Sequence, residues 1–506
     1  MSAAFDRLTA LVSEVVDLRH ASSLLGWDER VCMPPGGVAV HGDMVATIQR
    51  LAHQKFTSSE LGDLIAASGE DFRSLPDDSA PARVLKVTAR DHERATRVSS
   101  EYVFEHAQVV SAAHEAWQKA REQSDFSIFL PHLARVVKLK QQYVDFFPAV
   151  AHPYDALVED YEPGILTSDI QAIFDGLRPR QVELVRTIQQ HAAAAPINDG
   201  FLHGSYAEQE MLRFACEVIS TFGFDWKRGR QDKSAHPFAI PIGCDDVRIT
   251  TRFSESHPFE TLFSTMHECG HALYEQGVSP GWSRTLAEGG ASLGVHESQS
   301  RLWENLIGRS LPFWQHFFPL LRRRFAGQLD DVPLEAFYRA INRVQPSLIR
   351  VEADEVTYNL HVMLRVEIEI ALLTGAVSAK DAPAFWDEKM REYLGVVPDS
   401  AKNGILQDMH WSIGLFGYFA TYTLGNLISV QLWRTFVRDE PGWEEQIRRG
   451  DFERLGVWLR TSLHQHGRSR EPRDLVQEIT GGPISTEPYL DYLEAKYREI
   501  YCIASL

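Results

Sequence analysis

The sequence lacks the features of secreted, disulfide-stabilised proteins. Its five cysteines in 506 residues are scattered without paired spacing, which is typical of a reducing compartment and of a fold without disulfides. Charged residues such as Asp6, Arg7 and Glu14 interrupt the N-terminal stretch, where a signal peptide has its apolar core. We therefore expect a cytoplasmic protein.

A membrane-spanning segment is also missing. The one long stretch without a charged residue, 411–433, carries serine, threonine, asparagine and glutamine side chains and three glycines. A membrane span is predominantly apolar over about 20 residues. The polar groups in this stretch predict a fully buried helix instead.

Basic residues are outnumbered by acidic ones. The 51 lysines and arginines against 69 aspartates and glutamates give a formal net charge of −18. Nucleic acids and anionic membrane surfaces attract proteins that present a basic face. The charge balance therefore argues against both as partners of this chain.

Helical periodicity dominates what the sequence does contain. Apolar residues recur at intervals of three and four, with charges between them, over 83–121, 126–147, 168–195, 205–222, 295–325, 333–345, 355–375 and 380–394. The breaks at 74–82, 195–205 and 395–404 are too short for interdomain linkers. We therefore predict one mainly α domain over residues 1–506.

One region, 238–253, predicts strands. Val247, Ile249 and Thr251 alternate with more polar residues, and a turn is expected at Gly243. A small β-hairpin directly before the next helix is typical of a device that shapes a site.

The helix that follows carries His267-Glu268-Cys269-Gly270-His271, an H-E-x-x-H signature. Pro258 fits its start and Gly277 its end, which predicts a helix at about 258–276. Histidines four residues apart project from one helix face, so both imidazoles can hold one tetrahedral ion. Glu268 is placed to act as general base on a water that such an ion activates.

The structural alternative is an exposed helix face with two ordinary polar histidines. The neighbours of these histidines include Leu262, Phe263 and Met266, so this helix has little exposed character. Buried histidines and a buried carboxylate without partners would be strongly destabilising. We therefore favour a metal site.

A catalytic metal of this kind takes a third protein ligand and leaves one position to water. No H-x-x-G-x-x-H continuation follows, which excludes a metzincin. Glu275 lies too near on the same helix, whereas Glu288, in a glycine-rich turn, stays an alternative. We favour Glu297, on a helix predicted at about 292–308. Its structural alternative is a surface ion pair with Arg301, four residues on.

Further motifs are spread over most of the chain. In order they are Trp27-Asp28 with Met33-Pro34, Asp246 to Thr250 (D-x-R-x-T), the H-E-x-x-H helix, His296-Glu297-Ser298-Gln299, Ile349 to Asp354 (I-R-x-x-A-D) and Gly404 to Trp411 (G-x-x-Q-D-x-H-W). On these motifs the chain resembles the carboxypeptidase Taq family, the thermostable carboxypeptidase 1 type of metallopeptidase. This combination is far more specific than H-E-x-x-H alone.

The resemblance implies a zinc-type metallocarboxypeptidase that releases single amino acids from peptide C-termini with broad specificity. It implies His267, His271 and Glu297 as the ligands of one ion per subunit, with Glu268 as general base. Cobalt or another divalent metal in place of zinc stays open. The resemblance also implies a cytoplasmic homodimer with a mainly helical fold around a deep groove.

A carboxypeptidase needs a cation for the free carboxylate of its substrate, and arginine is well suited to bind it. Arg350 and Arg248 lie in family motifs and are the candidates, with structural ion pairs as the alternative for each. His410 is a candidate catalytic donor to the oxyanion or carboxylate, or a positioning residue. Tyr422 is a candidate catalytic group and Tyr418 a candidate substrate-binding group, with core packing as the alternative for both.

Two other functions stay open at this point. An oligopeptidase or dipeptidyl carboxypeptidase shares the metal core but releases internal fragments or dipeptides. A non-enzymatic helical scaffold with a vestigial motif is disfavoured, because Glu268 has no ligand role that would preserve it.

Overall fold

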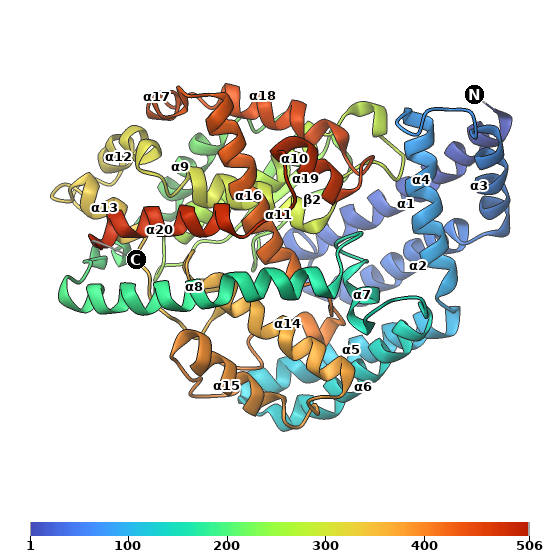
Figure 1. The fold of residues 1–506 in the computed structure, drawn as a ribbon, viewed down its shortest axis with the longest axis horizontal. Helices are drawn as coiled ribbons and strands as arrows, with labels where there is room; N and C mark the ends of the chain where they lie inside the picture. The colour runs from blue at the N-terminus through green and yellow to red at the C-terminus, as the bar shows by residue number, and fades with distance from the viewer. Residues whose placement is uncertain (1, 504–506) are drawn as a thin grey trace. The chain divides into compact units, whose positions relative to one another are not determined.

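The computed structural model describes residues 2–503, and among these residues it is mainly helical with one small sheet, as predicted (Figure 1). Contacts divide the chain into two compact units, each built from three segments. Unit 1 comprises Met1–Thr96, Asp199–Tyr338 and Leu432–Gly481, and unit 2 comprises Arg97–Asn198, Arg339–Gln431 and Gly482–Leu506. Only one predicted break, 195–205, coincides with a passage between units. The single domain stays a prediction.

The helices are bounded as follows. Unit 1 contains α1 (Ala3–Val31), α2 (Val38–Phe56), α3 (Ser59–Asp71), α9 (Glu208–Thr221), α10 (Glu260–Gly277), α11 (Leu293–Arg301), α12 (Leu311–Arg324), α17 (Trp443–Arg448), α18 (Glu453–Ser462) and α19 (Pro472–Thr480). Unit 2 contains α5 (Ser100–Gln123), α6 (Phe126–Asp145), α7 (Pro153–Val158), α8 (Thr167–Ala194), α14 (Tyr358–Thr374), α15 (Ala382–Leu394) and α20 (Glu487–Tyr501). A boundary between the units falls within α4 (Ala80–Arg97), α13 (Leu334–Ile341) and α16 (Ala420–Asp439).

The ends of several helices follow directly from the sequence. The hydroxyls of Ser58, Ser99, Ser292 and Ser310 each accept a hydrogen bond from the backbone N–H three residues on, at 3.1–3.4 Å, which is the usual stabilising N-cap. The caps at Ser99 and Ser310 explain why the segments predicted as continuous over 83–121 and 295–325 are interrupted. No described helix is long and apolar enough to span a membrane.

The predicted helix over 411–433 is wrong in its first part. Residues 410–413 form a short 3-10 turn, and Gly414 and Gly417 then adopt positive φ angles of 76° and 89°, a conformation that glycine reaches without strain. Helix α16 therefore begins at Ala420. From there on it is largely buried, as expected.

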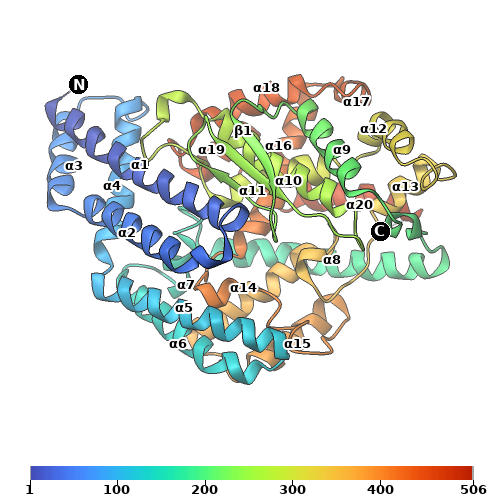
Figure 2. The ribbon, with the colours of Figure 1, turned by 180° about the vertical axis from the view of Figure 1, so that it is seen from behind.

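The sheet contains β1 (Gly229–Lys233), β2 (Ala239–Pro241) and β3 (Val247–Thr251) in the order β1-β3-β2. Strands β2 and β3 are antiparallel and form the predicted hairpin. Strand β1 pairs parallel with β3 and was not predicted, because Gly-Arg-Gln-Asp-Lys shows no apolar alternation. Figure 2 shows the sheet beside α10, against which β3 packs within unit 1.

Helices α10 and α11 approach each other unusually closely. A Cβ atom built on Gly270 would lie 2.5 Å from the backbone oxygen of Gln299 and 2.7 Å from the Cα of Ser300. Both contacts are with the α11 backbone, which cannot move aside as the end of a flexible side chain can. Glycine at this position of the H-E-C-G-H sequence therefore sets the distance between the two helices.

We predict that Gly270→Ala pushes α11 away from α10, because overpacking against a backbone typically costs about 1–3 kcal/mol. The expected result is a lower midpoint of thermal unfolding. Gly69→Ala is the matched control, because no atom beyond its chain neighbours and the backbone of its own helix lies within 4 Å of its built Cβ, and this change should stabilise the protein slightly. Equal midpoints for Gly270→Ala and the wild type would contradict the prediction.

Candidate functional site

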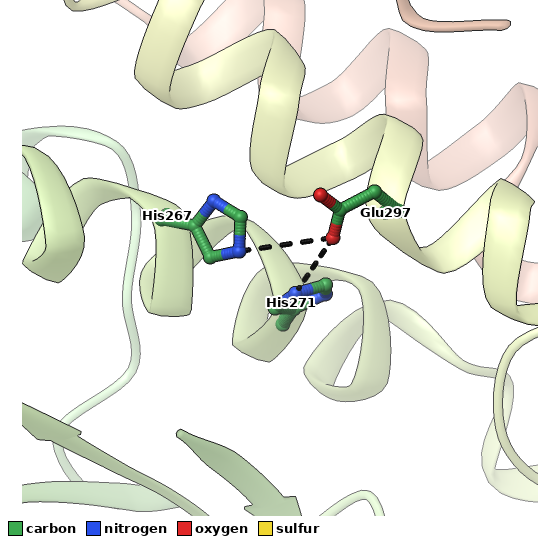
Figure 3. A group of neighbouring side chains, drawn as sticks. All are labelled: His267, His271 and Glu297. Carbon is green, nitrogen blue, oxygen red and sulfur yellow. Dashed lines mark ion pairs between the residues drawn. The ribbon is translucent and has the colours of Figure 1, made fainter. Parts of the chain in front are cut away.

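Two histidines of α10 and one carboxylate of α11 converge in unit 1 (Figure 3). His267, His271 and Glu297 each offer one ligand atom, and these atoms lie within 4.8 Å of one another. The two Nε2 atoms lie 3.7 Å and 3.5 Å from the same oxygen of Glu297, Oε2. Two ligands of a tetrahedral ion with bonds of about 2.0–2.2 Å lie about 3.4 Å apart. The three residues therefore fit a divalent ion.

The orientation of His267 is fixed by Glu304. After Arg301 the helix widens into a π-helix over Leu302–Ile307, a local geometry frequent at functional sites. Glu304 lies on this π-helix, and its Oε2 is 2.9 Å from Nδ1 of His267. With its Nδ1–H donated to Glu304, His267 directs Nε2 toward Glu297.

The orientation of His271 depends on a different pair. Its Nδ1 lies 2.6 Å from Nδ1 of His296, and Nε2 of His296 lies 2.7 Å from Oε1 of the buried Glu275. If His271 donates to His296 and His296 donates to Glu275, every bond in this chain has one donor and one acceptor. The Nε2 lone pair of His271 then also faces Glu297.

Burial and charge together shift the pKa values of this cluster. Burial lowers the pKa of His267, but Glu297 and Glu304 outweigh it and raise this pKa to about 9. Burial lowers the pKa of His271 to about 4. Burial raises the pKa of Glu297, but Arg301 and His267 hold it well below its usual range. The cluster therefore keeps an ionised carboxylate in a buried position, which favours a bound cation.

Glu268 is buried in the same region, one residue from His267. Burial raises its pKa to about 7, and the nearby carboxylates of Glu297 and Glu304 act in the same direction. A carboxyl group that titrates near neutral pH is suited to accept and release a proton.

Glu288, the alternative third ligand, is not a member of this group. Its two oxygens accept hydrogen bonds from the backbone N–H groups of Cys244, at 3.2 Å, and Arg284, at 2.9 Å. It therefore holds the turn between α10 and α11 against the β2–β3 hairpin.

Four other predicted residues, Arg350, His410, Tyr418 and Tyr422, lie together in unit 2. The Arg350 guanidinium carbon lies 5.0 Å from the centre of the Tyr422 ring. Nε2 of His410 lies 3.3 Å from the Tyr422 hydroxyl, and the rings of His410 and Tyr418 are 5.5 Å apart. The fold thus brings the I-R-x-x-A-D motif of Arg350 close to the G-x-x-Q-D-x-H-W motif of His410.

Asp408 fixes the position of the Arg350 side chain. Its Nε and Nη2 donate to Oδ1 of Asp408 at 3.1 Å and 2.8 Å, and its Nη1 donates to the Tyr358 hydroxyl at 2.9 Å. Nε of Arg365 donates to the other oxygen of Asp408 at 2.6 Å. Burial lowers the pKa of His410 to about 3, so this histidine is neutral. Two guanidinium groups share one carboxylate, which leaves this cluster suited to an anion.

Arg248 is engaged elsewhere in unit 1. Its Nε and Nη2 donate to the two oxygens of Asp246 at 2.9 Å and 2.7 Å. Its guanidinium carbon lies 4.4 Å from the centre of the Trp27 ring, a distance at which a cation–π contact is attractive. The D-x-R-x-T motif is thereby tied to the Trp27 motif of α1, and substrate binding by Arg248 stays a prediction.

Several residues of these clusters were not predicted from the sequence. Glu304 lies seven residues after Glu297, and that spacing places two side chains on one helix face. Arg365 lies between Leu364 and Val366 in an apolar run, which is the usual sign of a buried ion pair. The sequence places Glu275 only one turn after His271, and its contact with His296 depends on tertiary structure.

The chain matches the family model described as carboxypeptidase Taq (M32) metallopeptidase over residues 7–497. It belongs to this family. Thermostable carboxypeptidase 1 of Thermus thermophilus is 41% identical over 512 residues, which cover 99% of each chain. Carboxypeptidase 1 of Bacillus subtilis is 33% identical over 493 residues, 97% of this chain and 98% of that one.

Solved structures agree with the sequence comparisons. The M32 carboxypeptidase from Deinococcus radiodurans has a TM-score of 0.96 at 38% identity, covering 99% of this chain and 100% of that chain. Metallocarboxypeptidase 1 of Trypanosoma cruzi has a TM-score of 0.93 at 33% identity, covering 98% and 99%. The protein is thus of the metallocarboxypeptidase family, whose members are peptide hydrolases dependent on a divalent metal.

We predict that Glu304→Gln weakens the binding of a divalent ion, with added zinc as the probe, about 10–100-fold, the usual effect of removing a group that orients a ligating histidine. The neutral amide keeps the shape of the side chain but does not fix His267 as strongly. Competition with a chromophoric chelator measures the dissociation constant. Glu335→Gln removes the same charge at an exposed position of α13 and is the control. An unchanged dissociation constant for Glu304→Gln would show that Glu304 does not orient His267.

Proposed function

We propose that this protein is a carboxypeptidase that removes amino acids one at a time from peptide C-termini with broad specificity. The observation that carries the proposal is the convergence of both imidazole Nε2 atoms of α10 on one oxygen of Glu297. We propose zinc as the ion held by these residues, one per subunit, because two nitrogens and one carboxylate oxygen are typical of catalytic zinc. Cobalt or another divalent ion is compatible with the same donors.

The bound ion would supply Lewis-acid polarisation of the scissile carbonyl and would lower the pKa of a water molecule. Glu268 takes the proton from this water as the water attacks the carbonyl carbon, and it then passes the proton to the leaving amine. Its pKa near neutral in the buried site suits both transfers. His267 and His271 keep their orientation throughout because Glu304 and His296 hold their Nδ1 atoms.

We assign recognition of the substrate's free carboxylate to Arg350. Asp408 and Tyr358 fix its guanidinium in place, so little side-chain entropy is lost when an anion binds. The hydroxyl of Tyr422 and Nε2 of His410 are the neighbouring donors for the substrate or the oxyanion, with Tyr418 packed beside them. Arg248 is the weaker candidate, because Asp246 and Trp27 already engage it.

The remaining properties follow from the family resemblance and the composition. We propose that the substrates are peptides with a free C-terminus, that neither nucleic acid nor membrane is a partner, and that the protein acts as a cytoplasmic homodimer.

The function is tested by amino-acid release from a short defined peptide. Single amino acids should appear one after another, activity should disappear with a chelator, and zinc should restore it. Glu268→Gln should bind one zinc ion per chain yet lose at least about 100-fold in kcat, since general-base catalysis contributes about 10²–10⁴-fold. The metal-loaded wild type, prepared in parallel, is the control.

Two outcomes would contradict the proposal. Internal fragments or dipeptides among the products would instead indicate the oligopeptidase or dipeptidyl carboxypeptidase activity that shares this metal core. Full turnover by zinc-loaded Glu268→Gln would remove Glu268 as the general base.

We predict that Arg350→Ala lowers kcat/KM about 10–100-fold for a peptide with a free C-terminus, mainly through KM, because charged hydrogen bonds contribute about 1.5–3 kcal/mol. The same peptide with an amidated C-terminus should be affected much less, since it has no carboxylate to lose. Steady-state kinetics with the two peptides gives both values. An equal loss for both would make Arg350 a structural residue.

A further inference from the structure

The two oxygens of Glu297 have different partners. Oε2 faces Nε2 of both histidines, at 3.7 Å and 3.5 Å. Oε1 accepts a hydrogen bond from Nε of Arg301 at 2.7 Å. The side chains of Arg301 and Glu297 are only 12% and 8% exposed, so water does not compete effectively for this pair. One oxygen of the carboxylate is therefore committed to Arg301, and the other faces the metal position.

Arg301 is itself fixed at a second point. Its Nη1 lies 3.4 Å from Oε2 of Glu304, the same oxygen that lies 2.9 Å from Nδ1 of His267. Glu297, Arg301 and Glu304 follow one another at intervals of four and three, which places them on one helix face. A continuous chain of contacts thus runs from Glu297 through Arg301 and Glu304 to His267.

The other donor near Glu297 does not disturb this division. The Ser300 hydroxyl lies 2.7 Å from the backbone oxygen of Glu297 and 3.1 Å from its Oε2. Its single hydrogen favours the nearer carbonyl. Ser300 therefore neither occupies Oε1 nor blocks Oε2.

A carboxylate binds a metal through one oxygen or through both. Binding through both would bring Oε1 into a coordination position that a catalytic zinc leaves to water and substrate. To do so, Oε1 would have to leave a short, charge-assisted hydrogen bond from a buried guanidinium, a strong class of hydrogen bond. The contact with Arg301 opposes that change.

We propose that Arg301 is a positioning residue that keeps Glu297 a one-oxygen ligand and thereby keeps one coordination position of the ion open. This inference rests on the metal site of the proposed function. It adds a role for a residue that contacts neither the substrate nor the ion.

The test replaces Arg301 by methionine, which keeps most of the side-chain length and removes the donors. X-ray absorption of zinc-loaded Arg301→Met should show one additional oxygen neighbour compared with the wild type, and kcat should fall more than KM rises. Arg309→Met is the matched control. Arg309 also contacts Glu304, since its Nη2 lies 3.8 Å from Oε1 of Glu304, and its guanidinium lies over the Phe263 ring. The hydrogen bond to Oε1 of Glu297, however, comes from Arg301. Arg309→Met should keep the wild-type number of neighbours.

A conservative change gives the complementary result. Lysine four residues after a glutamate on a helix still reaches its carboxylate, so Arg301→Lys should restore the wild-type number of zinc neighbours and most of kcat. A merely structural role for Arg301 would alter the thermal midpoint without altering the zinc neighbours.

Three results would overturn the inference. These are a wild-type number of neighbours in Arg301→Met, the same additional neighbour in Arg309→Met, or a zinc-loaded wild-type crystal structure with both oxygens of Glu297 bonded to the ion. The last measurement needs no variant, so it decides the question even if Arg301→Met does not fold. Failure of the metal site itself is recognised separately, because His271→Ala would then bind zinc as tightly as the wild type.

Discussion

The close contact between α10 and α11 is the constraint on which the candidate metal site depends. Gly270 lets the backbone of α11 lie against α10, and only at this distance does Glu297 reach both histidines. A carboxylate in such a buried position needs several partners to remain ionised. Two imidazoles and the Arg301 guanidinium provide them. The distance between the two helices therefore also determines which charged groups surround Glu297.

Each unit contains a cluster of buried charged side chains, and the two clusters favour ligands of opposite charge. In unit 1 the carboxylates of Glu297 and Glu304 stay ionised in buried positions, which favours a cation. In unit 2 the guanidinium groups of Arg350 and Arg365 share the single carboxylate of Asp408, which favours an anion.

The sequence predicted those features that follow from local spacing. The end signals at Pro258 and Gly277 and the i, i+4 histidines predicted α10. The helical pattern that begins near Val295 predicted Glu297 as the carboxylate on the following helix. The sequence did not predict β1, whose polar residues form a strand only by pairing with β3. It also did not predict the contact of Arg365 with Asp408, 43 residues later. Such contacts are set by tertiary packing.

The π-helix over Leu302–Ile307 has a consequence for how this segment tolerates change. A π-turn holds more residues per turn than an α-helix and is the less favourable of the two geometries. Loss of one residue here would let the segment relax into an ordinary α-helix. The same loss would rotate Glu304 away from His267 and shift the cap of α12 at Ser310. The helix would become more regular, but Glu304 would no longer orient His267 in the candidate metal site. The length of this segment that gives the most stable helix is therefore not the length that aligns the site.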